Sequence, residues 1–197
     1  MTTTLRDIVG LGQAPSHLSE SALIMIDCQN TYREGVMQLE GVEEALIEAK
    51  KLLNLARDKG IPVFHIQHDG GEGSPYDLTT ALGAISEEVA PEDGEHVIVK
   101  NFPNAFIQTP LDEALRSRGI ENIILAGFMT HMCVNSTAHG AFNLGYQATV
   151  VARATATRSL QAADGSLISA KQVHEAALAS TRDLYAAVVN DIADLPA

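Results

Sequence analysis

Three residues with reactive side chains stand at or just after the ends of apolar segments in this sequence. Asp27 closes the run ALIMID, Lys100 closes the run EHVIVK, and Cys133 comes shortly after the run NIILAGF. In an open parallel sheet the ligand crevice lies beyond the carboxyl ends of the strands. A carboxylate, an ammonium group and a thiol that are far apart in the sequence can therefore meet at one edge of such a sheet.

The thiol of Cys133 would be the nucleophile of this group. A free thiol has a pKa of about 8.5, so only about 3% of it is thiolate at neutral pH. The partial positive charge of a helix N-terminus and the ammonium group of Lys100 would both favour the thiolate. Asp27 could accept the thiol proton, pass it to a leaving group and later activate water. Together these groups predict acyl transfer.

The turn that leads to Cys133 supplies a further part of such a site. The backbone N–H groups over Met129–Cys133 open a predicted helix and so lack intrahelical acceptors, which suits them to bind an oxyanion. Each of the three side chains also has an ordinary interpretation: a capping Asp, a solvated Lys and a buried, inert Cys. Residue types and spacing alone leave these alternatives open.

The elements that must position these residues alternate between β-rich and helical segments. The first strand is expected over Ala22–Asp27. An amphipathic helix is expected over Val42–Asp58, because acidic residues lie near its start, basic residues lie near its end, and Gly60 can terminate it. Further strands are predicted over Pro62–His68, Glu95–Lys100, Asn122–Phe128, Gln147–Ala152 and Ala186–Val189, and further helices over Leu111–Arg118, about His131 to Leu144, and Ala170–Ser180.

Strands that are apolar on both faces and alternate with helices predict a parallel sheet covered on each side. We therefore expect an α/β fold, a three-layer α/β/α sandwich of the doubly wound, Rossmann type. No linker or internal repeat divides the sequence, which predicts one domain over residues 1–197 with an N-terminal extension over residues 1–20. The irregular segment Asp69–Gly94, rich in Gly, Pro, Asp and Glu, is a candidate lid.

Composition narrows the possible partners. The 197 residues include 13 Lys and Arg against 25 Asp and Glu, a net charge of −12, which disfavours binding to nucleic acid and to anionic membranes. No apolar run approaches the ~20 residues that span a bilayer, and the first twenty residues lack the pattern of a secretory signal. We therefore expect a cytoplasmic protein. Its two cysteines, Cys28 and Cys133, form no disulfide framework.

Several blocks of the sequence, in their order along the chain, resemble the isochorismatase-like cysteine hydrolases. The resemblance implies that Asp27, Lys100 and Cys133 form a catalytic triad at a six-stranded parallel sheet. It also implies a small-molecule substrate, no cofactor, and a homodimer or larger homo-oligomer. The blocks are IDCQN at Ile26–Asn30, KNFPNAF at Lys100–Phe106 and AGFMTHMCVNST at Ala126–Thr137, continued by NLGY at Asn143–Tyr146 and by Thr149–Ala154.

The same resemblance implies a non-proline cis peptide bond just before the nucleophile. It would fall here between Met129 and Thr130. Such a bond would aim backbone N–H groups of the turn, including that of Cys133, at the oxygen of the substrate.

The presence of Cys133 favours attack on a carbonyl carbon, and so cleavage of an amide or related C–N bond. Isochorismatases, which cleave a vinyl ether by acid catalysis, resemble this pattern but generally lack the Cys. Two alternatives stay open: ether hydrolysis with Asp27 as the acid, and a non-catalytic or redox-sensing protein whose thiol is modified. Metal-dependent nicotinamidases carry an Asp-x-His pair, which the stretch HIQHD at His65–Asp69 lacks, so no metal is expected.

Six further residues are candidates for contact with the substrate. His68 ends its strand and is expected to line the pocket, while His131 lies in the turn before the nucleophile, where a plain surface role is equally open. The other four lie close in sequence to triad members, and core burial remains the alternative for the aromatic ones. They are Tyr32, Phe102, Asn104 and Phe106.

Three residues near the candidate site have mainly structural interpretations. His65 lies three positions before His68, on the opposite face of the strand, and is expected to pack in the core. Cys28 should leave the opposite face from Asp27 and also pack in the core. Arg153 stands where relatives usually have an Asp, which would either reroute a structural ion pair or alter the rim of the pocket.

Overall fold

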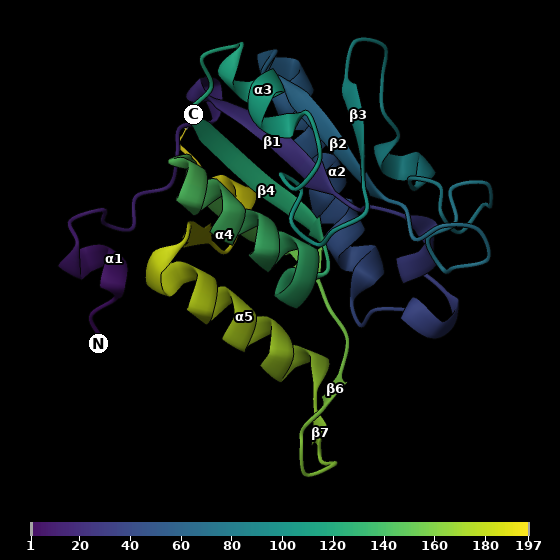
Figure 1. The fold of residues 1–197 in the computed structure, drawn as a ribbon. Coiled ribbons are helices and arrows are strands. Elements are labelled where there is room, and N and C mark those ends of the chain that lie inside the picture. The colour runs from purple at the N-terminus through teal and green to yellow at the C-terminus, as the bar shows by residue number, and fades with distance from the viewer. Residues whose placement is uncertain (1, 197) are drawn as a thin grey trace.

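The computed structural model describes residues 2–196 and contains a parallel sheet of six strands (Figure 1). The strand order is β3-β2-β1-β4-β5-β8, and every neighbouring pair is parallel. This confirms the predicted α/β class and the six-stranded sheet. The strands are β1 (Ser21–Ile26), β2 (Val63–His68), β3 (His96–Lys100), β4 (Asn122–Phe128), β5 (Gln147–Ala156) and β8 (Ala187–Val189).

Helices cover both faces of this sheet, as the all-apolar strands require. Figure 1 shows α3, α4 and α5 in front of the sheet and α2 behind it. Two buried clusters result, because alternate strand residues point to opposite faces: Leu23 and Met25 pack with α2, whereas Ile24 and Ile26 pack with α3 and α4. The helices are α2 (Val42–Lys59), α3 (Leu111–Arg116), α4 (Asn135–Leu144) and α5 (Ala170–Leu184).

Local sequence signals explain where α2 begins and ends. Glu43 and Glu44 lie in its first turn, and Arg57 and Lys59 lie in its last, so both ends complement the helix dipole. Gly60 follows with φ +66°, a left-handed conformation that glycine adopts without steric cost and that ends the helix. The predicted helix is confirmed to within one residue.

Three features of the fold went beyond the sequence-based prediction. Strand β5 continues to Ala156, four residues past its predicted end, because its pairing with β4 resumes at Thr155 after a shift in register that spans the exposed Arg153. A small hairpin, β6 (Leu160–Gln161) and β7 (Leu167–Ile168), projects from the body below α5 (Figure 1). A short helix, α1 (Leu5–Ile8), also precedes the sheet.

The segment 69–94 contains turns and one short 3₁₀ helix, Glu87–Val89, and it crosses the carboxyl end of β1. The backbone N–H groups of Asn30 and Thr31 donate to the carbonyls of Ala84 and Leu82. The side chain of Gln29 donates to the carbonyls of His68 and Gly83. The segment is therefore fastened over the edge of the sheet at which the reactive residues were expected.

The order of the strands creates a switch point between β1 and β4, where the connections turn toward opposite edges of the sheet. Ligands bind beyond the carboxyl ends of the strands at such a point in open α/β sheets. Gly127 of β4 lies so close to β1 that a Cβ atom there would collide with the backbone of Ile26. Among the described residues, no helix is long and apolar enough to cross a membrane.

Candidate active site

The ammonium group of Lys100 lies at the centre of a buried polar cluster. Its Nζ is 2.7 Å from Oδ2 of Asp27, 3.1 Å from Nδ1 of His68 and 3.4 Å from Sγ of Cys133. The side chains of Lys100 and Asp27 have no exposed surface. A lysine ammonium has three N–H groups to donate, and three acceptors surround this one. The structure thus brings together the three residues that the sequence placed at one edge, and adds His68.

Each of these side chains is positioned by the end of a strand. Asp27 follows β1 directly and has φ +50°, a left-handed conformation that Asp adopts more readily than most residues. Lys100 is the last residue of β3 and is paired in register with His68, the last residue of β2. Cys133 lies beyond β4 in a π-helical turn over Thr130–Val134, here called the nucleophile turn.

The cis peptide bond lies between Phe128 and Met129, one residue earlier than predicted. The prediction between Met129 and Thr130 was wrong because the family pattern does not fix where the chain leaves the sheet. Phe128 forms the last pair of the β4–β5 ladder with Ala156, so the cis peptide bond joins the last paired residue of β4 to the first residue after the strand.

The nucleophile turn leaves N–H groups free at its start. The N–H groups of Met132 and Val134 donate to the carbonyl of Met129, at 3.0 and 3.3 Å. Thr130 and His131 open the turn, where a helical segment offers its N–H groups no acceptor of its own. Those two N–H groups, beside Cys133, are the candidates to bind an oxyanion.

The electrostatics of the thiol differ from the expectation of a resting thiolate. Burial and the negative charge of Asp27 together raise the pKa of Cys133 to about 12, and the nearby charge of Lys100 offsets only part of this. Cys133 is only 5% exposed. Burial also raises the pKa of Asp27, against the opposing effect of Lys100. The thiol therefore rests protonated, and its proton has a carboxylate beside it to move to.

Asp27 is well placed to take that proton. Its pair with Lys100 is close but is not aligned as a regular hydrogen bond, and neither carboxylate oxygen has another partner among residues 2–196. The carboxylate is close enough to Cys133 for its charge to raise the pKa of the thiol, after the larger effect of burial. Lone pairs on Asp27 consequently remain available for the thiol proton or for a water molecule.

Aromatic side chains form one wall beside the cluster. Burial and the charge of Lys100 lower the pKa of His68 to about 4, so its ring is neutral at neutral pH and its Nδ1 can accept from the ammonium. Its ring meets that of Tyr76 edge to face at 5.0 Å, and Tyr76 meets Tyr32 in the same way at 5.7 Å. Tyr32 is buried, and its pKa is raised by burial and by the negative charge of Asp27.

The other three candidate residues of the KNFPNAF block differ in their surroundings. Phe106 is buried and stacks on Tyr146 at 5.5 Å, which is the core role left open above. The side chain of Asn104 accepts a hydrogen bond from the N–H of Phe106 and lies against Gly140 of α4. Phe102 is 42% exposed, two residues after Lys100.

His65 and Cys28 have the structural positions expected of them. His65 is buried and its Nε2 lies 2.8 Å from the carboxylate of Glu95, which also binds Arg57. Cys28 is buried in the cluster on the α2 side, whereas Cys133 belongs to the cluster on the other side, and both thiols are free. Within residues 2–196 there is no group of three or more His, Cys, Asp or Glu side chains that could hold a metal ion.

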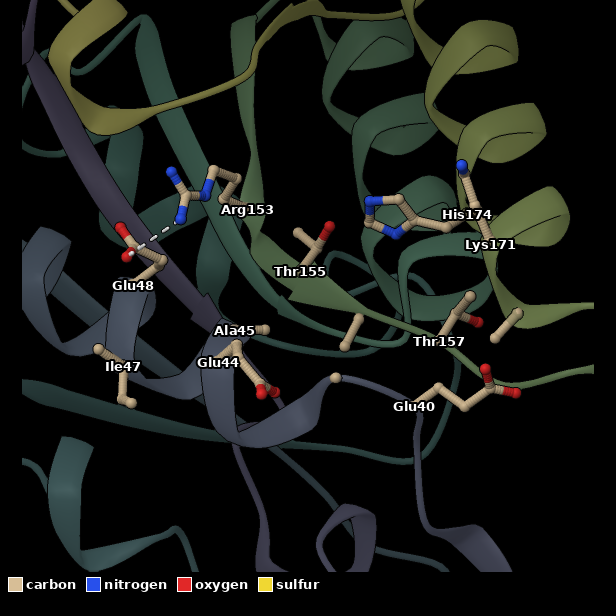
Figure 2. A pocket seen from close by; sticks show the side chains of 13 residues that line it. Glu40, Glu44, Ala45, Ile47, Glu48, Arg153, Thr155, Thr157, Lys171 and His174 are labelled. Atoms are coloured by element: carbon tan, nitrogen blue, oxygen red, sulfur yellow. Dashed lines mark ion pairs between the residues drawn. The ribbon is translucent and has the colours of Figure 1, made fainter.

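Arg153 lies on the wall of a groove of about 530 Å³ and not at the triad (Figure 2). It pairs with Asp191 at 2.8 Å and approaches Glu48 at 3.9 Å, so the first of the two interpretations above, a rerouted ion pair, describes its contacts. The groove lies between α2, the carboxyl end of β5 and the start of α5, and its lining includes His174 but neither Lys100 nor Cys133.

One residue near the site was missed by the sequence analysis. Arg158 makes no hydrogen bond or ion pair within the described part of the chain, and its Nε is buried without a partner. Its positive charge lowers the pKa of His131 in the nucleophile turn and opposes the rise in the pKa of Tyr76. The strand-end rule would have indicated Arg158, had β5 been extended to Ala156.

Comparison with known proteins identifies the family. The model of the isochorismatase domain matches residues 21–190 of the 197. A crystal structure of an isochorismatase from Pseudomonas putida KT2440 is 37% identical, with a TM-score of 0.95 over 99% of this chain and 100% of that one.

The chain belongs to the isochorismatase family of hydrolases.

Two curated relatives differ in what their names describe. A ureidoacrylate amidohydrolase of Stutzerimonas stutzeri is 32% identical over 70% of this isochorismatase-family chain and 70% of its own length. A secreted isochorismatase effector of Verticillium dahliae is 30% identical over 95% of this chain and 97% of its own. Family membership therefore establishes a hydrolase, and amide hydrolysis occurs among its relatives.

The electrostatics predict how the thiol responds to the loss of Asp27. An Asp27→Asn variant lacks the negative charge that raises the pKa of Cys133. We expect the midpoint of the pH profile for alkylation of Cys133 by iodoacetamide to shift to lower pH. Each unit of that shift increases the thiolate fraction at neutral pH about tenfold.

Intact-protein mass spectrometry would measure alkylation rates from pH 6 to 10; because the wild-type midpoint near pH 12 lies above this range, a lower midpoint in Asp27→Asn appears as faster alkylation at each pH, and an unchanged midpoint as equal rates. A Cys133→Ala variant supplies the background from Cys28, which is buried and has its pKa raised further by burial and by Asp27. An unchanged or higher midpoint in Asp27→Asn would contradict this description of the site.

Proposed function

We propose that this isochorismatase-family hydrolase cleaves a small amide or related C–N bond through a thioester on Cys133. The observation that carries the proposal is the position of one buried ammonium, Lys100 Nζ, within 2.7 Å of Asp27 and 3.4 Å of the thiol. A cation that can stabilise a thiolate, with a carboxylate that can receive its proton, suits nucleophilic catalysis by cysteine.

In the first half of the reaction, the proton of Cys133 moves to Asp27 while the thiolate that forms is stabilised by Lys100. Sγ attacks the carbonyl carbon of the substrate, and the N–H groups of Thr130 and His131 bind the oxyanion. Asp27 returns the proton to the nitrogen, the C–N bond breaks, and ammonia or an amine leaves. A thioester remains on Cys133.

In the second half, Asp27 takes a proton from water, and the oxygen of that water attacks the thioester carbonyl. The C–S bond breaks, the acid leaves, and Cys133 recovers its proton from Asp27. Because burial raises the pKa values of both groups, the proton passes between two sites of similar environment and need not enter bulk water. The raised thiol pKa is thus compatible with catalysis through an internal transfer.

A panel of small primary amides, ureido acids and carbamoyl amino acids tests the proposal. We expect release of ammonia or amine by the wild type and its loss in Cys133→Ala, since that variant lacks the thiol to which Lys100 donates. Turnover that survives in Cys133→Ala would overturn the thioester route. Consumption of isochorismate by Cys133→Ala but not by Asp27→Ala would support the ether-hydrolase alternative.

We infer further that the substrate carries a carboxylate or similar anionic group, which Arg158 binds. An arginine with a buried Nε and no acidic partner, near His131 and Tyr76, is suited to bidentate recognition of a carboxylate. The name of the amidohydrolase relative describes such a compound, since ureidoacrylate is a ureido derivative of a carboxylic acid.

Replacement of Arg158 by Met should raise KM for an anionic amide at least about tenfold, because a charge-assisted hydrogen bond is worth about 1.5–3 kcal/mol. The same variant should leave KM unchanged for an uncharged amide of similar size. Arg153→Met is the matched control, because Arg153 lies in the groove away from the thiol. Equal KM values for the anionic amide in wild type and Arg158→Met would contradict this role.

Two other expectations stay predictions. A homodimer or larger assembly can be tested by sedimentation of the purified chain. The cytoplasmic location expected from the sequence is a matter for fractionation, since one relative is described as secreted.

A further inference from the structure

Hydrogen bonds to side chains of α5 and of the residue after β5 fix the nucleophile turn in place. Thr130 Oγ1 lies 2.9 Å from Nδ1 of His174 on α5, and Nδ1 of His131 lies 2.5 Å from Oγ1 of Thr157. Just past the turn, Asn135 donates to the hydroxyl of Thr181 at 2.8 Å. The turn that carries the nucleophile and the candidate oxyanion donors is thus fastened to β5 and α5.

Of these contacts, the hydrogen bond between Thr130 and His174 constrains the turn most strongly. Thr130 is 1% exposed, and His174 is the only hydrogen-bond partner recorded for its hydroxyl among residues 2–196. A buried hydroxyl that loses its partner is left unsatisfied, and its chain shifts to find another. Since Thr130 also supplies one of the two N–H groups that open the turn, such a shift would move an oxyanion donor.

The groove shown in Figure 2 makes this contact accessible from outside the triad. Its volume of about 530 Å³ lies between α2 and the start of α5, and the imidazole of His174 is part of its lining. Thr155, in β5, and Thr157, just after the end of β5, line the same groove. A molecule as small as imidazole can fit into such a volume.

We propose that His174 is a positioning residue, which acts through Thr130 to fix the nucleophile turn and its oxyanion donors. The inference rests on the proposed function, because it assigns His174 to the same acyl transfer. His174 does not touch the triad. Its effect is on acylation, where misplacement of a donor by about 1 Å can cost about 100-fold in rate.

The test compares two reactions of the same thiol. Acylation of Cys133 by p-nitrophenyl acetate forms an oxyanion, whereas alkylation by iodoacetamide forms none. We expect His174→Ala to slow acylation by about 10- to 100-fold while it leaves alkylation within about twofold of the wild type. Release of p-nitrophenolate, corrected for the release by Cys133→Ala, measures acylation even where the thioester is then hydrolysed, and intact-protein mass spectrometry measures alkylation, so oxyanion binding and exposure of the nucleophile are separated.

Two forms of rescue distinguish positioning from a general loss of structure. Imidazole added to His174→Ala should restore acylation in a saturable manner, since the groove can hold it, and His174→Asn should retain much of the rate because its amide can bond to Thr130. Lys171→Ala is the matched control from the same groove and should behave as the wild type, with and without imidazole.

Equal acylation rates in the wild type and His174→Ala would overturn the role of His174 and leave the proposed function intact. A parallel loss of acylation and alkylation, without rescue by imidazole, would also overturn it. No release of p-nitrophenolate by the wild type beyond that of Cys133→Ala would contradict the proposed function, and the inference with it.

Discussion

The buried ammonium group of Lys100 is the interaction on which the site depends. A charged amine without exposed surface is costly to fold unless acceptors surround it, and Asp27, His68 and Cys133 provide them. Removing one member of such a buried pair typically costs about 3–5 kcal/mol, because the other charge stays uncompensated. The positions of the thiol, the carboxylate and the imidazole are therefore not independent, since the same ammonium group pairs with Asp27 and donates to His68 and Cys133.

The sheet is what makes this cluster possible. Lys100 ends β3 and reaches across the end of β2 toward β1, while the nucleophile turn arrives from β4 on the other side. Gly127 allows β4 to come close to β1 at the switch point, where a side chain would collide with Ile26. Apolar layers on both faces fix the strand ends, and the carboxyl edge is the place where unpaired polar groups collect.

Local pattern sufficed for much of the fold. Alternating apolar strands and capped helices predicted the six strands of the sheet to within a few residues, because burial on both faces leaves an unbroken apolar run such as NIILAGF. The end of β5 was missed since Arg153 is exposed beside a groove, and exposure at one position does not end a ladder. The hairpin β6–β7 has only two residues in each strand, which is too few to show the alternation of apolar and polar residues that predicts a strand.

The candidate site was predicted less completely. The strand-end rule placed Asp27, Lys100 and Cys133 at one edge, but it could not supply the distances that decide protonation. The expected helix N-terminus and the ammonium group of Lys100 predicted a thiolate, whereas burial and the charge of Asp27 raise the pKa of Cys133 and favour the thiol. The hydrogen bond of His174 to Thr130 and the effect of the Arg158 charge on His131 both join segments distant in sequence, and no local spacing marks such proximity.

The most direct test of the central role of Lys100 is a double-mutant cycle in the free energy of unfolding, with Lys100→Met, Asp27→Asn and the double variant. Lys100→Met leaves Asp27 buried without its cation, so the pKa of that carboxyl in the folded state, which burial already raises, rises further above its unfolded value of about 3.9. Its destabilisation should therefore be largest at neutral pH and should fade as the pH falls toward that value.

At neutral pH, we expect the double variant to lose less free energy of unfolding than the two single variants lose together. The difference, which is the coupling energy, should be at least about 2 kcal/mol. Additive effects, within about 0.5 kcal/mol, would contradict it, because the ammonium and the carboxylate would then not compensate each other.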